Sequence, residues 1–215
     1  MNEFLKETDF LNFTHVTLDK FILDLSSDEI DKACELYYRV RDGFLYDPYH
    51  LDLRLPALTA SVIASGKRAW CVEKSILLAA LFRKVGIPSK LGYAVVTNHI
   101  GVDKLKGYLQ REEIVFHGFV EAFLEGKWVK CTPAFDRRIC RLTGVDPLDW
   151  DGKSDSMFQS FEKNRKFMEY IHFYGSFADV PLELMNEEMK KYYPHLFQNT
   201  YSTKEFSFRH LWSPE

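Results

Sequence analysis

Cys71 stands at the start of a long apolar run, Trp70-Cys-Val-Glu-Lys-Ser-Ile-Leu-Leu-Ala-Ala-Leu-Phe-Arg-Lys-Val85, which is closed by Gly86-Ile-Pro88. The run predicts a buried helix that begins at the cysteine, because a glycine just past the last turn and a proline soon afterwards are typical of helix ends. A thiol at a helix N-terminus faces unpaired N–H groups and the positive end of the helix dipole, which favour the thiolate. Cys71 is therefore predicted to be an activated nucleophile.

A cysteine nucleophile needs a base within hydrogen-bond reach, and the base needs a third group to orient it. His117 opens an apolar, branched and aromatic stretch, Ile114 to Leu124, which predicts a strand. Glu125-Gly126 then makes a tight turn, and Lys127 to Thr132 returns as the antiparallel partner until Pro133 ends the pairing. His117 is the predicted base.

The third group follows from the register of this hairpin. With the tip at Glu125-Gly126, the positions opposite His117 fall near 132–136. That window contains Thr132, which can accept a hydrogen bond, and Asp136, which also carries a charge. Either residue could orient the histidine, and Asp136 is the first candidate because it is the nearest carboxylate.

Two further residues are candidates for substrate binding. Trp70 precedes the predicted nucleophile and could form a wall of a substrate channel, although a tryptophan in this setting is usually core. His99 lies in a polar connection from Thr97 to Glu113, and a connection of this length is often a functional loop or lid.

The remaining pattern describes the elements that must position these groups. A helix is predicted from Ser26 to Gly43, a short helix at 58–65, a strand near 91–96 and a helix that opens at 179–183 and runs to about 193. Residues 1–26 show loose strand and turn signals, 44–55 reads as loop, and the periodicity of 167–174 fits a strand or a helix. With no repeat or linker, residues 1–215 are predicted to form one continuous domain.

Composition excludes several classes. The 28 basic and 31 acidic residues give a net charge of −3 and are interspersed, so no nucleic-acid partner is expected. No run of about 18 apolar residues predicts a membrane span, and the acidic N-terminus does not resemble a signal peptide. The four cysteines, which are at 34, 71, 131 and 140, have neither metal-site nor CxxC spacing. We expect reduced thiols, a cytoplasmic location, and neither metal nor cofactor.

These motifs together resemble the transglutaminase-like superfamily. The likeness covers residues 28–136 and is carried by Cys71 with its helix, Gly86-Ile-Pro88, His117-Gly-Phe-Val-Glu121 and Trp128-Val-Lys-Cys-Thr-Pro133. The segment Tyr38-Arg-Val-Arg-Asp-Gly-Phe-Leu-Tyr46 also fits. The resemblance implies a papain-like α+β core, with the cysteine on a central helix packed on an antiparallel sheet. Residues 141–215 would be a C-terminal elaboration.

The resemblance also implies a Cys-His-Asp triad and acyl transfer on amides, which is cross-linking, deamidation or peptide cleavage of a protein or peptide substrate. The chain departs from the family at Thr132, where an aspartate usually precedes the proline. A catalytically silent peptide-binding module is therefore the alternative, because some family members have lost activity. A related thiol enzyme that acylates small amines or removes glycans is a third possibility.

Overall fold

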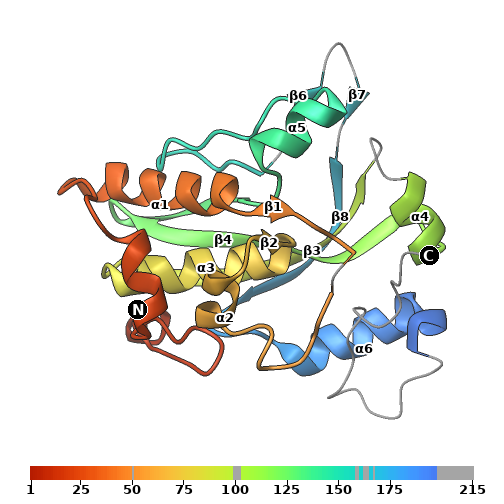
Figure 1. Ribbon diagram of the computed structural model, residues 1–215, viewed down its shortest axis with the longest axis horizontal. Helices are drawn as coiled ribbons and strands as arrows, with labels where there is room; N and C mark the ends of the chain where they lie inside the picture. The colour runs from red at the N-terminus through yellow and green to blue at the C-terminus, as the bar shows by residue number, and fades with distance from the viewer. Residues whose placement is uncertain (50, 99–102, 158–159, 162–164, 167, 198–215) are drawn as a thin grey trace.

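A four-stranded antiparallel sheet forms the centre of the computed structural model, which describes residues 1–49, 51–98, 103–157, 160–161, 165–166 and 168–197. Its strands lie in the order β5-β4-β3-β8 (Figure 1). Their bounds are β3 Ser89–Asn98, β4 Glu113–Leu124, β5 Lys127–Cys131 and β8 Met168–Phe177. The chain thus has the predicted α+β fold with an antiparallel sheet.

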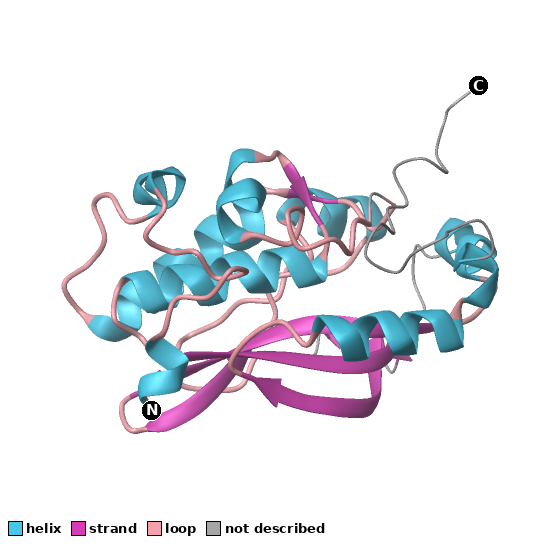
Figure 2. Ribbon diagram, turned by 90° about the horizontal axis from the view of Figure 1, so that it is seen from below, coloured by secondary structure: helices cyan, strands magenta, loops and turns pink. Residues whose placement is uncertain are grey.

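Helix α3, Cys71–Lys84, packs against β4, and the residues from Cys71 to Arg83 are buried. Gly86, with φ of 85°, follows the helix in the left-handed region as the sequence predicts. Helices α1, Glu29–Gly43, and α2, Ala60–Ser65, contact α3. Figure 2 shows most helices gathered on one side of the sheet. The cysteine helix is therefore enclosed between the sheet and other helices.

Most predicted elements are confirmed within a few residues. Helix α1 begins at Glu29, because Asp28 rather than Ser26 caps it by accepting the N–H of Asp31 at 3.0 Å. The hairpin has the predicted tip, with Leu124 paired to Lys127. Helix α6 spans Leu182–Tyr192 and ends before Pro194 as expected.

Three local predictions were wrong or incomplete. The long polar connection contains a helix, α4 (Asp103–Leu109), and the N-terminal stretch forms 3-10 helices at Asn2–Leu5 and Val16–Phe21. Within the predicted loop at 44–55, β1 (Leu45–Tyr46) pairs in parallel with β2 (Arg68–Ala69). These short elements depend on contacts with distant residues, which local patterning does not contain.

The C-terminal part contributes to the central sheet. Strand β8 pairs with β3 along its length, which decides the ambiguity over 168–174 in favour of a strand, and α6 packs on β4. Residue 167 lies outside the described residues. The smaller elements are α5 (Arg137–Thr143), β6 (Ser160–Phe161), β7 (Arg165–Lys166) and a 3-10 helix at Pro194–Phe197. The described residues after 136 thus pack against the predicted core and add a strand to its sheet.

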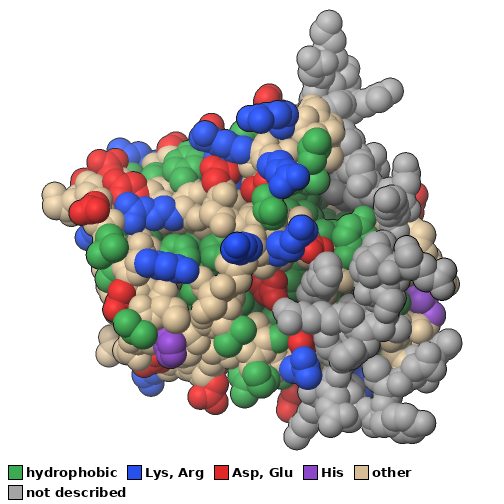
Figure 3. Space-filling model, viewed as in Figure 1, with side chains coloured by type: hydrophobic (Ala, Val, Ile, Leu, Met, Phe, Trp, Pro, Cys, Tyr) green, Lys and Arg blue, Asp and Glu red, His purple; other side chains and the backbone are tan. Residues whose placement is uncertain are grey.

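The surface mixes side chains of both charges. Over α1 and α5, Lys and Arg side chains are interspersed with acidic and hydrophobic ones (Figure 3). Among the described helices, none combines the length and hydropathy needed to span a bilayer.

Candidate active site

The start of α3 meets β4 at Gly118, and the absence of a side chain there allows the approach. A Cβ added at Gly118 would lie 3.1 Å from the carbonyl oxygen of Cys71 and 3.0 Å from Oγ of Ser75. The backbone N–H of Gly118 lies close enough to the Cys71 sulfur to lower the pKa of the thiol. The structure therefore brings the predicted nucleophile to the strand position directly after His117.

Strand β4 is irregular just before His117. Phe116 has φ of 56°, an uncommon value for an aromatic residue, and the pairing of β3 with β4 shifts register between Ala94 and Val96. Bulges of this kind bend a strand and redirect side chains, and they are over-represented next to active sites. The distortion adjoins the histidine that the sequence selects.

His117 is a buried histidine with an unsatisfied nitrogen. Its side chain is 1% exposed, and Nε2 has no hydrogen-bond partner. The ring lies edge-on to Tyr170 of β8, with 5.9 Å between the ring centroids. Burial lowers the pKa of His117 to about 4, so the imidazole is neutral at pH 7. A neutral imidazole with an unused nitrogen can accept a proton.

Cys71 does not have the lowered pKa that its helix position predicts. Burial is the largest influence and raises the pKa of the thiol to about 11. The N–H groups of Gly118, Val72 and Cys71 itself lower it, but they only partly offset desolvation, and the carboxylate of Glu73 raises it further. The expected resting thiolate is therefore corrected to a protonated thiol, because removal from water outweighs the helix end here.

Tyr46, at the end of β1, supplies a polar group to the thiol. Its hydroxyl interacts electrostatically with the Cys71 thiol, and both residues line the same cavity. Its ring packs on Phe135 with centroids 4.7 Å apart, and its backbone N–H donates to Oδ2 of Asp136 at 2.7 Å. The ring contact and the backbone hydrogen bond thus both fix the position of the Tyr46 side chain beside the sulfur.

Asp136 holds the backbone of this tyrosine through its carboxylate. Besides the Tyr46 N–H, its carboxylate accepts the N–H groups of Arg138 and Ile139 at 2.9 and 3.2 Å, and so caps α5. Every hydrogen bond shown for Asp136 in the described part of the chain goes to the backbone. The structure therefore joins Asp136 to Tyr46, whereas the sequence-based expectation was a contact with the imidazole.

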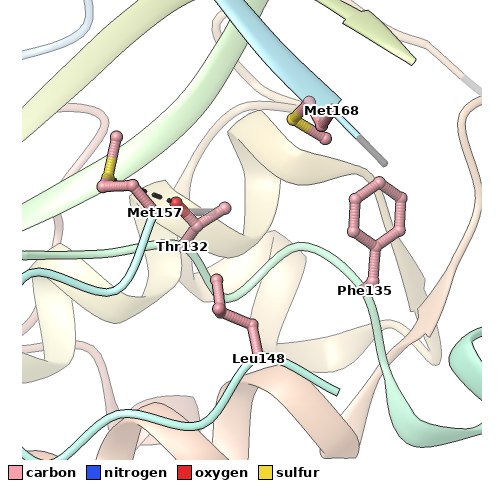
Figure 4. Close-up of a pocket in the computed structure, with 5 residues that line it drawn as sticks. All are labelled: Thr132, Phe135, Leu148, Met157 and Met168. Atoms are coloured by element: carbon pink, nitrogen blue, oxygen red, sulfur yellow. Dashed lines mark hydrogen bonds between the residues drawn. The ribbon is translucent and has the colours of Figure 1, made fainter. Parts of the chain in front are cut away.

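Thr132 lies near Tyr170, the aromatic residue that packs against His117. Its hydroxyl oxygen is 3.4 Å from the Tyr170 hydroxyl and 3.5 Å from Sδ of Met157. Figure 4 shows Thr132 lining a small pocket together with four apolar residues: Phe135, Leu148, Met157 and Met168. Thr132 is connected to His117 through Tyr170, since Tyr170 contacts both residues.

A second, apolar cavity opens beside Cys71. It is partly open to solvent and includes Trp70 and Cys71 in its wall. Trp70 is 4% exposed, as expected for a residue of a channel wall or a core. His99, the other predicted substrate-binding residue, lies outside the described residues.

Several buried polar atoms on elements that meet at the start of α3 have no partner. Among the described residues, six buried side-chain atoms have no hydrogen-bond partner. They include Nε1 of Trp70, the residue before Cys71, and Nε2 of His117, the residue before Gly118. Such atoms are rare in native proteins, and each one requires an explanation.

Sequence reasoning missed Tyr46 and Tyr170 as site residues. Tyr46 lies within the segment that resembles the family, and that was the one signal which could have selected it. Tyr170 lies 53 positions after His117, and no local pattern brings it to the imidazole. None of the four cysteines forms a disulfide, and no metal-binding cluster of His, Cys, Asp or Glu occurs in the described ranges.

Comparison with known proteins gives one family and one solved structure. The structure is that of a candidate cysteine protease from Cytophaga hutchinsonii, with 14% sequence identity and a TM-score of 0.46. The match covers 60% of this chain and 40% of that one, so the chain spans less than half the length of that protein. No curated protein matches.

The family comparison covers more of the chain. The sequence pattern of the transglutaminase-like superfamily matches residues 17–133, which is more than half of the 215 residues. The matched range includes Cys71, His117 and Thr132, and ends before Asp136. Together with the cysteine helix packed on an antiparallel sheet, this match shows that the chain belongs to the transglutaminase-like superfamily.

Proposed function

We propose that this protein is a cysteine-dependent acyl-transfer enzyme that acts on amide bonds, as a transglutaminase, a deamidase or a peptidase. The observation that carries the proposal is the buried, unpartnered Nε2 of His117, one residue from the glycine whose N–H reaches Cys71. The large majority of buried side-chain polar atoms in native proteins have a partner, so an unpartnered nitrogen at this depth requires an explanation, and a catalytic role is one. Membership in a superfamily that includes cysteine proteases and acyltransferases supports the same conclusion.

The reaction begins from a neutral thiol and a neutral imidazole. As the Cys71 sulfur attacks the carbonyl carbon, His117 accepts the thiol proton, and a tetrahedral intermediate with a negative oxygen forms. His117 then passes that proton to the departing amine, the carbon–nitrogen bond breaks, and a thioester remains on Cys71. Water or a second amine attacks the thioester and releases the acyl group.

Two donors are available for the negative oxygen of the intermediate. The backbone N–H of Cys71 lies in the first turn of α3, and the Tyr46 hydroxyl adjoins the sulfur. Donors held in place before the reaction stabilise such an oxygen at little reorganisation cost. In this proposal Asp136 acts by fixing Tyr46, and Thr132 acts through Tyr170 by fixing the ring of His117.

The test compares wild-type protein with Cys71→Ser, using Cys34→Ser as the matched control at a half-buried cysteine outside the site. Release of aryl amine from a panel of aryl amides is followed with and without hydroxylamine as an acyl acceptor. Wild type and Cys34→Ser should turn over, while Cys71→Ser should not. Full activity in Cys71→Ser would overturn the proposal.

The silent peptide-binding module is the second candidate, favoured by the neutral residue Thr132 where the family usually has a carboxylate. In that case wild type and Cys71→Ser would bind peptides equally well and neither would release an amine. Turnover of small amines or glycan amides, with proteins and peptides left intact, would instead favour the third possibility.

A further inference from the structure

Few polar groups belong to the wall of the cavity beside Cys71. Besides Cys71 itself, Tyr46 and Trp70 line it, and Nε1 of Trp70 has no hydrogen-bond partner. Tyr193 also lines the cavity, but its hydroxyl donates to the carbonyl of Glu113 at 2.8 Å and accepts the N–H of Val115 at 3.0 Å. Its polar group is therefore already satisfied by the protein backbone.

The rest of the wall is hydrocarbon and thioether. Leu105 and Leu109 come from α4, Met189 comes from α6, and all three are at most 7% exposed. No charged side chain lines the cavity within the described part of the chain. Burying a charged substrate group here would cost a large desolvation free energy with no partner to offset it.

We propose that this cavity is the acyl-group pocket, and that it selects donors with an uncharged, apolar acyl group. The proposal rests on the acyl-transfer function proposed above and adds the class of acyl donor. The carbonyl lies beside Cys71, Tyr46 and Trp70, and the body of the acyl group lies against the apolar side chains of the wall. Small-ligand sites are typically lined mostly by apolar side chains with a few polar groups.

Part of the pocket lies outside the segment that matches the family. Met189 and Tyr193 follow residue 133, where the family match ends. The C-terminal part of the chain, which α6 brings against β4, therefore completes a wall that residues before 133 begin.

The first test measures acylation of Cys71 by p-nitrophenyl acetate, butyrate, 3-phenylpropionate and hemisuccinate. The sulfur forms a bond to the acyl carbon, the ester C–O bond breaks, p-nitrophenolate leaves with the electron pair, and the thiol proton goes to His117. Each rate constant for acylation of Cys71 is divided by the rate constant for acylation of N-acetylcysteine by the same ester. We expect the phenylpropionate to exceed the acetate by at least about tenfold, and the butyrate to exceed the hemisuccinate similarly, since each methylene in an apolar pocket is worth about 10–200-fold.

Substitutions in the cavity wall test whether the cavity causes the preference for apolar acyl groups. Leu109→Ala and Met189→Ala should each reduce the advantage of the longer acyl groups severalfold. Met185→Ala is the matched control, because Met185 is fully buried on the same helix but does not line the cavity. This variant should lose stability and keep the wild-type order of rates.

The outcomes separate the two proposals. Acylation of Cys71 with equal rates, or with the hemisuccinate favoured, would overturn the pocket and leave the acyl-transfer function standing. If no ester acylates Cys71, the proposed acyl-transfer function is overturned. The proposed pocket is then tested separately, by calorimetric titration of Cys71→Ser with 3-phenylpropionamide and with succinamate. Binding of the first amide alone supports it, and any other result contradicts it.

Discussion

The stretch that ends at Pro133 and the stretch that follows it contribute differently to the site. The first holds Cys71 and His117, and it holds Tyr46 beside the sulfur. The second places Tyr170 against the imidazole and Met189 in the wall of the cavity. The first stretch supplies the atoms that would react, whereas the second supplies their surroundings.

Substitutions in the two stretches should therefore have different consequences. Changes at Cys71, His117 or Tyr46 in the first stretch should reduce the chemical step for every substrate. Changes in the second should alter which substrates enter, or reduce rates modestly, because no predicted reacting group comes from there.

The largest effect after loss of Cys71 is expected for His117→Gln. Glutamine keeps a polar side chain of similar size but cannot accept the thiol proton, so kcat/KM should fall by about 10²–10⁴-fold, the usual contribution of a general base. Amine release and thermal melting measured together would separate lost chemistry from lost folding. A folded variant with near wild-type kcat/KM would remove His117 from the mechanism.

Tyr46→Phe tests the oxyanion donor within the same stretch. The phenyl ring can still pack on Phe135, and the hydroxyl beside Cys71 is lost, so kcat should fall by about 10²-fold, near the lower end for one oxyanion donor. KM should change little. A rise in KM with unchanged kcat would indicate that Tyr46 binds substrate without stabilising the intermediate.

Burial of His117 also predicts a pH-dependent stability. The pKa is about 4 in the folded protein and 6.5 when exposed, so between these values the unfolded chain binds a proton that the folded chain does not. The free energy of unfolding should therefore fall as pH decreases from 6.5 to 4, by about 3 kcal/mol from this group. Urea midpoints of wild type and His117→Gln across this range isolate the contribution, since other groups are shared. Parallel curves would contradict it.

The smallest effect is expected for Tyr170→Phe, in the second stretch. The ring against His117 remains and only the hydroxyl near Thr132 is lost, so kcat/KM should fall by less than about tenfold, comparable to one ordinary hydrogen bond. A loss as large as that of His117→Gln would abolish the distinction between the two stretches.

Much of the fold could be predicted from the sequence because its signals are local. The apolar run with Gly86 and Pro88 defines α3, and Glu125-Gly126 defines the hairpin. Helix α4 was missed because its residues lie in a polar segment whose few apolar side chains, such as Leu105 and Leu109, become buried only through tertiary contacts.

The site could be predicted less completely. The residue types and order selected Cys71 and His117, but the orienting partners depend on side-chain directions that the register does not give. Asp136 is within four residues of Thr132, yet its carboxylate turns to the backbone of Tyr46. The pKa of Cys71 was expected to be low because the helix end is visible in the sequence, whereas complete burial of the thiol is not.

The central claim is that the thiol of Cys71 attacks with His117 as its base. Its most direct test is peptide mapping by mass spectrometry after brief treatment of wild type and His117→Gln with an activated acyl donor at pH 7. A thioester is expected on the Cys71 peptide of wild type, and it should be lost with hydroxylamine and be nearly absent in His117→Gln. Equal labelling of Cys71 in both proteins, or labelling confined to Cys34, Cys131 or Cys140, would contradict it.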